Sequence, residues 1–282
     1  MWRFVHTGNR SPAENMAIDE AMLSAHQEGI TPPTVRFYGW NPATLSIGYF
    51  QQADKEVDFA ALRSRGIGFV RRATGGRAVL HDRELTYSII VSESYPGIPA
   101  SVTEAYRVLS IGLLEGFRRL GLDARMTGMD AVMDEAEETA ALSSTGSSAC
   151  FDSPTRYELV VEGRKIAGSA QMRAKGVILQ HGSILLDLDT NLLFDVLRFP
   201  DERAKIRMKR VFESKAVAVN ACMRERNKPT VTMTELEAAF RAGFAEGLGA
   251  DLVPGKLSDL EEERARLLAI EKYASDGWNL RR

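Results

Sequence analysis

The chain has 282 residues, and its 36 basic and 38 acidic side chains leave a formal net charge of −2. A balance so close to neutral gives no large positive field, so we expect neither a nucleic acid nor a membrane surface as a partner. The first residues lack an apolar signal segment and no apolar run is long enough to cross a bilayer, which predicts a cytoplasmic protein with a sizeable core.

Hydrophobic periodicity predicts alternating helices and strands through the first 120 residues. In order, these are a helix over about 11–27, strands at 34–38 and 44–49, a helix over 57–65, strands around 68–72 and 83–91, and a helix over 101–120. Pro12 suits the first turn of the first helix, and Gly66 suits a left-handed residue that ends the second. Ser101 and Glu104 have the spacing of a capping box at the start of the third.

Residues 129–149 interrupt this pattern, because they are rich in Glu, Ala, Ser and Gly and carry no sustained apolar face. We interpret them as a loop that leads directly to Cys150, either an active-site lid or an ordinary surface loop. Beyond it, alternation of apolar and polar residues predicts a β-meander. Its strands are expected at 157–161, 164–172 and 177–188.

The remaining residues are highly charged, and their pattern predicts mostly helices. Thr234 and Glu237 are spaced to cap a helix, and Pro254-Gly255 indicates a linker before a solvated C-terminal helix. We therefore expect a catalytic domain over residues 1–250 and a helical appendage over 251–282.

The densest positive stretch precedes these two helices. It contains Arg203, Lys205, Arg207, Lys209 and Arg210. Such a stretch either steers an acidic partner protein by its charge or is a solvated helix face.

The most informative segment is 71–82, with the sequence RRATGGRAVLHD, which lies between two apolar runs. Gly75 and Gly76 lack a β-carbon and can take positive φ, so a ligand can approach the bare backbone and its amide donors. The same residues also suit a plain tight turn between the flanking strands.

Charged side chains surround these glycines. Arg72 and Arg77 are expected at the mouth of a pocket, and the alternative of a plain surface arginine is strongest for Arg71. His81 and Asp82 are interpreted as hydrogen-bonded supports of the loop, with a catalytic pair as the less favoured alternative.

A second segment, 165–171, has the sequence KIAGSAQ. RRxxGGxxVxHD followed by KIxGxAQ resembles the lipoate-protein ligase and octanoyltransferase superfamily, whose fold is shared by the biotin protein ligases. Further similar segments are 15–20, 45–51, Lys272-Tyr273 and Trp278-Asn279. The resemblance implies an α/β (α+β) fold with a mixed, largely antiparallel central sheet flanked by helices. It also implies a substrate site at Arg72, Gly75, Gly76, Arg77, His81, Gly168, Ser169 and Ala170.

Cys150 distinguishes between members of this superfamily, because its segment, SACFDSPTRYE, resembles that of LipM-type octanoyltransferases. The resemblance implies that Cys150 takes octanoate from octanoyl-acyl carrier protein and passes it to a lysine of the glycine-cleavage H protein, in lipoate assembly. ATP-dependent ligases need no nucleophile there and usually carry a third glycine where Arg77 stands. The sequence therefore favours a transferase that uses neither ATP nor a metal.

The proposed nucleophile needs a cation, because a free cysteine with a pKa of about 8.5 is mostly protonated in the cytosol. Lys165 is the expected supplier, since a nearby ammonium favours the thiolate. Its alternative is an ordinary lysine at a strand edge. Backbone amides near Gly168, Ser169 and Ala170, or in the paired glycines, are candidates to stabilise the oxyanion that forms in acyl transfer.

Other functions remain open from the sequence. Cys222, between Ala221 and Met223, is interpreted as an inert buried thiol, and the four histidines lack metal-binding spacing, so no metal is expected. The alternatives are an amidotransferase that moves octanoyl between carrier-protein lysines, an ATP-dependent lipoate-protein ligase, and a non-catalytic protein that binds acyl carriers.

Overall fold

The computed structural model of the protein describes residues 1–128 and 157–281. The strands are β1 (Trp2–Arg10), β2 (Thr34–Trp40), β3 (Thr44–Ile47), β4 (Gly68–Arg71), β5 (Val79–His81), β6 (Glu84–Ser92), β7 (Ala124–Met126), β8 (Leu159–Val161), β9 (Arg164–Ala174), β10 (Val177–Leu185) and β11 (Leu252–Gly255). The helices are α1 (Pro12–Gln27), α2 (Ala53–Glu56), α3 (Phe59–Ser64), α4 (Val102–Arg119), α5 (Thr190–Asp195), α6 (Glu202–Lys215), α7 (Val219–Glu225), α8 (Met233–Gly247), α9 (Asp259–Leu268), the π-helical turn η3 (Ala269–Tyr273) and α10 (Asp276–Asn279). The loop predicted at 129–149 and Cys150 lie outside the described residues.

A mixed eight-stranded sheet forms the centre of the molecule, in the order β11-β1-β2-β6-β10-β9-β8-β7. Strand β1 runs parallel to β11 and to β2, and all other neighbours are antiparallel. The predicted largely antiparallel sheet is therefore confirmed, as is the meander, which consists of β8, β9 and β10. Strand β1 has no clear alternating pattern, and sequence periodicity does not indicate it.

A second sheet has three strands in the order β4-β3-β5. Strand β3 is parallel to β4 and antiparallel to β5, so it lies between the two strands that flank the glycine loop. The alternative of a tight turn between paired strands is therefore wrong. The loop instead crosses from one edge of the small sheet to the other.

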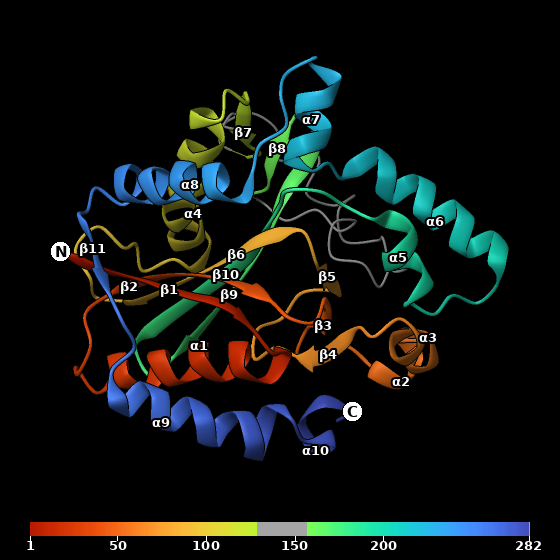
Figure 1. Ribbon diagram of the computed structural model, residues 1–282. Helices are drawn as coiled ribbons and strands as arrows, with labels where there is room; N and C mark the ends of the chain where they lie inside the picture. Colours follow the sequence, from red (N-terminus) through yellow and green to blue (C-terminus); the bar gives the residue numbers. More distant parts are fainter. Residues whose placement is uncertain (129–156, 282) are drawn as a thin grey trace.

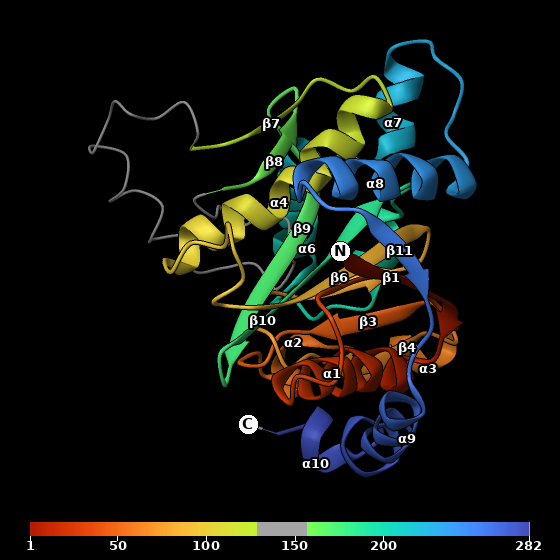
Figure 2. The ribbon, with the colours of Figure 1, turned by 90° about the vertical axis from the view of Figure 1, so that its left-hand side faces the viewer.

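Helices cover both faces of the large sheet (Figures 1 and 2). Helices α4 and α8 bury one face with a large apolar core, whereas α1, backed by α9, covers the other. A third apolar cluster fills the space between the small sheet and helices α2, α3, α5 and α6. Within the described ranges, no helix has both the length and the apolar character needed to span a membrane.

Helices α4 and α8 approach closely because glycines line their contact. A β-carbon on Gly112 would lie 2.4 Å from the Phe244 ring, and one on Gly243 would lie 2.4 Å from the Gly116 backbone nitrogen. The apolar stripe predicted along α4 is confirmed as core, since Leu109 and its neighbours along the stripe are buried there.

Two predicted helix caps need correction. Ser101 caps α4 by accepting from the Glu104 amide, but the Glu104 carboxylate binds Arg107 and Tyr157 instead of returning to the cap. Helix α8 starts earlier than expected, because its capping box is formed by Thr232 and Glu235, not by Thr234 and Glu237. The pattern S/T-x-x-E occurs twice in this segment, and local spacing alone does not choose between them.

The C-terminal residues are joined to the main sheet. Pro254 and Gly255 belong to β11, which pairs with β1, so the expected linker is wrong. The following α9 packs on α1, and its Glu261 forms a buried ion pair with Arg3 at 2.6 Å. The proposed division at residue 250 stays a prediction, although strand pairing crosses it.

Candidate active site

A pocket of about 390 Å³ opens where the glycine loop meets β9 and β10. Its walls are partly apolar, with Met16, Trp40 and Val79 among them. Six of the predicted substrate-binding residues line it, namely Arg72, Gly76, His81, Gly168, Ser169 and Ala170. Gly75 and Arg77 do not, although both belong to the same loop. The structure thus brings the two sequence motifs together, and the roles of their residues stay predictions.

Close backbone contact fixes the shape of the glycine loop. Gly76 has φ +97°, which glycine adopts without strain, whereas Gly75 does not take positive φ. A β-carbon on Gly48 would lie 2.0 Å from the Gly76 carbonyl oxygen. The expected special conformation is therefore confirmed at one of the paired glycines, and a third glycine from the turn after β3 is needed beside it.

The Arg72 side chain donates hydrogen bonds to backbone carbonyls of its own loop. Its guanidinium donates to the Ser46 hydroxyl at 2.6 Å and to the carbonyl oxygens of Gly75 and Arg77 at 3.2 and 2.9 Å. The side chain is 5% exposed and lines the pocket. Because three of its contacts are with the protein itself, Arg72 contributes to the shape of the pocket wall as well as to its charge.

Arg71 is fully buried, so the alternative of a plain surface arginine is wrong. Its guanidinium donates to six carbonyl oxygens, those of Gly48, Tyr49, Gln51, Trp278, Asn279 and Arg281. The Arg71 amide also donates to the Asn279 side chain at 2.8 Å. Burial lowers the pKa of Arg71 from its usual value. Arg71 thereby connects the C-terminal segment to the outer side of the glycine loop.

His81 is hydrogen-bonded to Glu84 and not to Asp82, and its role as a support of the loop stays a prediction. Its Nδ1 lies 2.6 Å from Glu84 and its Nε2 lies 2.6 Å from the Ser46 hydroxyl, which also accepts from Arg72. Asp82 lies at the surface. The ring of His81 stacks on Trp40 with centroids 4.2 Å apart.

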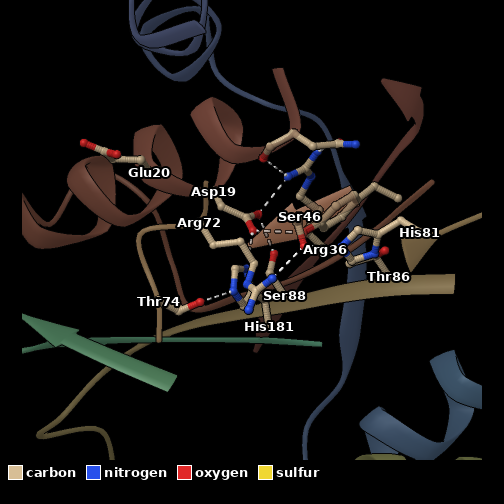
Figure 3. A network of polar contacts seen from close by, with 12 residues as sticks. Asp19, Glu20, Arg36, Ser46, Arg72, Thr74, His81, Thr86, Ser88 and His181 are labelled. Carbon is tan, nitrogen blue, oxygen red and sulfur yellow. Dashed lines mark hydrogen bonds and ion pairs between the residues drawn. The ribbon is translucent and has the colours of Figure 1, made fainter. Parts of the chain in front are cut away.

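A second buried histidine, His181 of β10, has a similar pair of contacts (Figure 3). Its Nδ1 lies 3.2 Å from Asp19 of α1, and its Nε2 lies 2.7 Å from the Thr74 hydroxyl in the glycine loop. Asp19 also binds Arg36 at 2.7 Å and accepts from Ser88 at 2.8 Å. Figure 3 shows Glu20 of the same helix pointing away from this cluster.

Burial determines the proton arrangement of the His181 cluster. It lowers the pKa of His181 despite the opposing Asp19 carboxylate, so the ring is neutral at neutral pH. Burial also tends to raise the pKa of Asp19, but the Arg36 guanidinium and the His181 hydrogen bond outweigh it and lower that pKa. A carboxylate only accepts, so Nδ1 donates to Asp19, and Nε2 accepts from the Thr74 hydroxyl.

Sequence reasoning missed Asp19, Thr74, Glu84 and His181 as a group. Asp19 lies in segment 15–20, which resembles the superfamily, and Thr74 lies in the glycine motif. The sequence motifs could therefore have identified both as site residues. His181 and Glu84 carry no local signal, since each is an ordinary strand residue until the fold places it beside its partner.

Lys165 lies near the start of β9 and is 7% exposed, so it is not an ordinary lysine at a strand edge. Its Nζ forms an ion pair with Glu158 at 2.7 Å. Its backbone pairs with Ala216, directly after α6, and its carbonyl accepts from the Val217 amide at 2.9 Å. The contacts of Cys150, its predicted partner, lie outside the described residues.

The pocket-lining part of β9 differs from the part that carries Lys165. Strand β8 pairs with β9 only over residues 164–167, and β10 pairs with its other edge. Among the residues that the structure describes, Gly168, Ser169 and Ala170 therefore have no ladder partner on the β8 side. Successive backbone amides of a strand face alternate edges, so only part of these amides face away from β10, and their role as oxyanion donors stays a prediction.

A second pocket, of about 1080 Å³, adjoins the first and shares Met16 and His181 with it. Lys272 and Tyr273 line it and both bind Glu20, at 2.7 and 2.5 Å. These are residues of the C-terminal segments that resemble the superfamily. Segments that are distant in sequence thus meet around two neighbouring pockets that share lining residues.

Of the two cysteines, Cys222 lies within the described residues. Its predicted character as an inert buried thiol agrees with the structure. It is 1% exposed, and burial raises the pKa of its thiol, which disfavours the reactive thiolate.

Comparisons with known proteins agree with this geometry. The family model for the lipoyl protein ligase A/B catalytic domain matches residues 11–245. Octanoyltransferase LipM of Geobacillus kaustophilus is 59% identical over 282 residues, which cover 100% of this chain and 99% of the relative. Octanoyltransferase LipM of Bacillus subtilis is 57% identical over 281 residues, with 100% and 98% covered.

Solved structures of lipoate protein ligases are similar to this chain over almost its whole length. A bipartite lipoate protein ligase of Thermoplasma acidophilum has a TM-score of 0.79 and 28% identity, covering 99% of this chain and 95% of the other. A lipoate-protein ligase A bound with ATP has a TM-score of 0.74 and 27% identity, with 99% and 97% covered. The chain belongs to the lipoyl protein ligase A/B catalytic-domain family and, within it, to the LipM octanoyltransferases.

Proposed function

We propose that the protein is an octanoyltransferase of protein lipoylation, which moves octanoyl from octanoyl-acyl carrier protein to a lysine of the glycine-cleavage H protein through a thioester on Cys150. The observation that carries the proposal is the placement of a partly apolar pocket and the buried Lys165 on one strand, β9, in a chain so similar to octanoyltransferases.

The pocket suits an acyl group bound by its chain and activated at its carbonyl. Met16, Trp40 and Val79 offer apolar surface to the hydrocarbon chain. The edge of β9 at Gly168 and Ser169 has no β8 partner among the described residues, and the amide that faces this edge is a donor for the carbonyl oxygen. The glycine loop closes the opposite wall, with Gly76 contributing bare backbone.

In the first step, the Cys150 thiolate attacks the thioester carbonyl of the donor. A carbon–sulfur bond to Cys150 forms, the bond to the carrier's prosthetic thiol breaks, and that thiol leaves as a thiolate that takes up a proton. One thioester replaces another, so the exchange is close to balanced in free energy. Lys165 supplies the positive charge that favours both thiolates.

In the second step, the neutral amine of the acceptor lysine attacks the Cys150 thioester. A carbon–nitrogen bond forms, the carbon–sulfur bond breaks, and the proton from the amine passes to water as Cys150 returns to the thiolate. An amide is more stable than a thioester, so this step is downhill. The reaction therefore needs no ATP and no metal, and Arg77 stands where ligases usually carry a third glycine.

Intact mass spectrometry tests the covalent step. Wild-type protein is mixed with octanoyl-acyl carrier protein without ATP, beside the Cys150→Ala and Cys222→Ala variants. We expect an octanoyl adduct on the wild type and on Cys222→Ala, absent from Cys150→Ala and discharged by added H protein. The second cysteine serves as the matched control because it is buried.

The alternatives give different results in the same assay. Acylation only with ATP and free octanoate would indicate a ligase and remove the role of Cys150. An adduct formed from octanoyl-H protein but not from octanoyl-acyl carrier protein would indicate an amidotransferase. Binding of the acyl carrier without any adduct would indicate a non-catalytic binding protein.

The role of Lys165 is tested by the reactivity of Cys150. In Lys165→Gln, which keeps a polar side chain of similar length, the pH midpoint of iodoacetamide alkylation at Cys150 should rise and adduct formation should slow by about tenfold or more. An unchanged midpoint in a folded variant would contradict the proposed role of this lysine.

A further inference from the structure

Helix α6 is a local positive region on a chain of net negative charge. It contains six basic residues and two acidic ones. Figure 1 shows it along the outer side of the molecule, next to α5.

The structure divides the five basic residues before Lys215 into two sets. Lys205 binds Asp195 at 2.7 Å, and Lys209 lies 3.7 Å from Glu213, so both charges are partly neutralised. Arg203, Arg207 and Arg210 are exposed and form no hydrogen bond or ion pair with any residue in the described ranges.

The three unpaired arginines share one face with two exposed aliphatic side chains. Ile206 is 45% exposed and Val211 is 38% exposed. Residues three and four positions apart lie side by side on a helix, so these five residues, Arg203, Ile206, Arg207, Arg210 and Val211, form one continuous surface, the α6 stripe. Arginines around exposed aliphatics are more typical of a protein contact than of a solvated face, where the apolar groups bring no benefit.

The α6 stripe is connected directly to the proposed active site. The residue that follows α6, Ala216, pairs with Lys165. At 1.5 Å per residue, the stripe extends from roughly 8 to roughly 20 Å along the helix axis from that pair.

This offset distinguishes between the two protein substrates. An acceptor lysine reaches the thioester only if its domain lies against the pocket mouth. A donor carrier holds its acyl group on a long flexible phosphopantetheine arm, so its body docks at a distance. Acyl carrier proteins are acidic, which complements the arginines.

We propose that the α6 stripe docks the acidic acyl carrier protein that delivers the octanoyl thioester. The proposal rests on the proposed function and adds the place where the donor binds. Arg203, Arg207 and Arg210 attract the carrier's carboxylates, and Ile206 and Val211 contact its apolar surface.

The test compares two donors in steady-state kinetics, octanoyl-acyl carrier protein and octanoyl-pantetheine, which has no carrier body. The stripe variant carries Arg203→Glu, Arg207→Glu and Arg210→Glu. We expect its KM for the carrier-bound donor to rise by about tenfold or more, with kcat retained and kcat/KM for octanoyl-pantetheine unchanged.

A matched control variant carries Arg63→Glu, Lys228→Glu and Lys256→Glu, which change the net charge equally at exposed positions elsewhere. It should keep the wild-type KM for the carrier. Ile206→Ser changes no charge and should raise the same KM by a smaller factor, which separates docking from long-range attraction.

Three results would overturn the docking proposal. These are an unchanged carrier KM in the stripe variant, an equal rise in the control variant, and a rise in the KM of the acceptor protein instead of the donor. Failure of the wild type to accept octanoyl from either donor would instead show that the proposed function itself is wrong, and the docking proposal would fall with it.

Discussion

The two sides of the glycine loop are fixed in different ways. On the pocket side, Thr74 and Arg72 contact buried clusters built around His181 with Asp19 and around His81 with Glu84. On the outer side, Arg71 binds carbonyl groups of a segment more than 200 residues later. The inner contacts lead to a cluster that contains the buried ion pair of Asp19 with Arg36, whereas the outer contacts join one charge to neutral carbonyls.

This difference predicts that contacts on one side stabilise the whole fold, whereas contacts on the other side stabilise one segment. Buried charges are costly when a partner is lost, so the inner side links the shape of the pocket to the stability of the whole fold. We expect loss of the outer contacts to release a peripheral segment and to leave the sheet in place. Substitutions on the two sides should therefore differ in their global effect.

The largest effect is expected for Asp19→Ala. The substitution leaves the fully buried Arg36 without its carboxylate partner and His181 without its acceptor. We expect the free energy of unfolding to fall by about 3–5 kcal/mol, measured by urea denaturation. The control Asp82→Ala removes an exposed carboxylate and should change it by less than about 0.5 kcal/mol. Similar losses in both variants would contradict the importance of the inner cluster.

A smaller and more local effect is expected for Arg71→Met. The methionine fills part of the space but leaves carbonyls of Trp278, Asn279 and Arg281 without their donor. We expect a loss of about 2 kcal/mol, with faster amide hydrogen exchange confined to α10 and the turn after β3.

Arg65→Met is the matched comparison for Arg71, because it removes an arginine from an exposed ion pair with Asp195. It should change stability by less than about 1 kcal/mol. Uniformly faster exchange across the sheet in Arg71→Met would show that the outer contact also supports the whole fold.

The smallest expected effect is the pH dependence of the free energy of unfolding. Burial lowers the folded-state pKa of His181, so below about pH 6.5 the unfolded chain takes up a proton that the folded protein does not. This contribution to stability is present above pH 6.5 and is lost as the pH falls toward the folded pKa, by at most about 1.4 kcal/mol per pH unit.

His181→Gln isolates this contribution. The variant should show a shallower decline of unfolding free energy between pH 7 and 5 than the wild type, in urea titrations at each pH. The lowered pKa of Asp19 acts in a separate, more acidic window, below about pH 4, where protonation of Asp19 removes its contribution. An identical slope in both proteins would exclude His181 as the source.

Much of the fold follows from local patterns. Helix α1, the meander and the left-handed stop at Gly66 come from caps, alternation and glycine conformation, which act over a few residues. The strands β1 and β11 were missed because their pairing joins residues about 250 positions apart. Pro254-Gly255 looks like a linker locally, and a parallel edge position accommodates it as a strand.

The candidate site shows the same limit. The motifs identified six of the fourteen residues that line the pocket, because glycine and arginine patterns are contiguous in sequence. They assigned His81 to its neighbour Asp82, whereas a strand sends adjacent side chains to opposite faces and Glu84 meets the ring instead. The exposure of Arg71 could not be judged either, since its partners belong to a distant segment.

The contacts of Arg71 join segments that are synthesised at different times. Residues 278–281 are synthesised more than 200 residues after the glycine loop, which at cellular rates takes roughly 10–40 s. During that interval the sheet strands β2 to β10 leave the ribosome before the segment that completes the outer side of the loop. A nascent chain can therefore form most of its core before the contacts that hold the outer side of the glycine loop are complete.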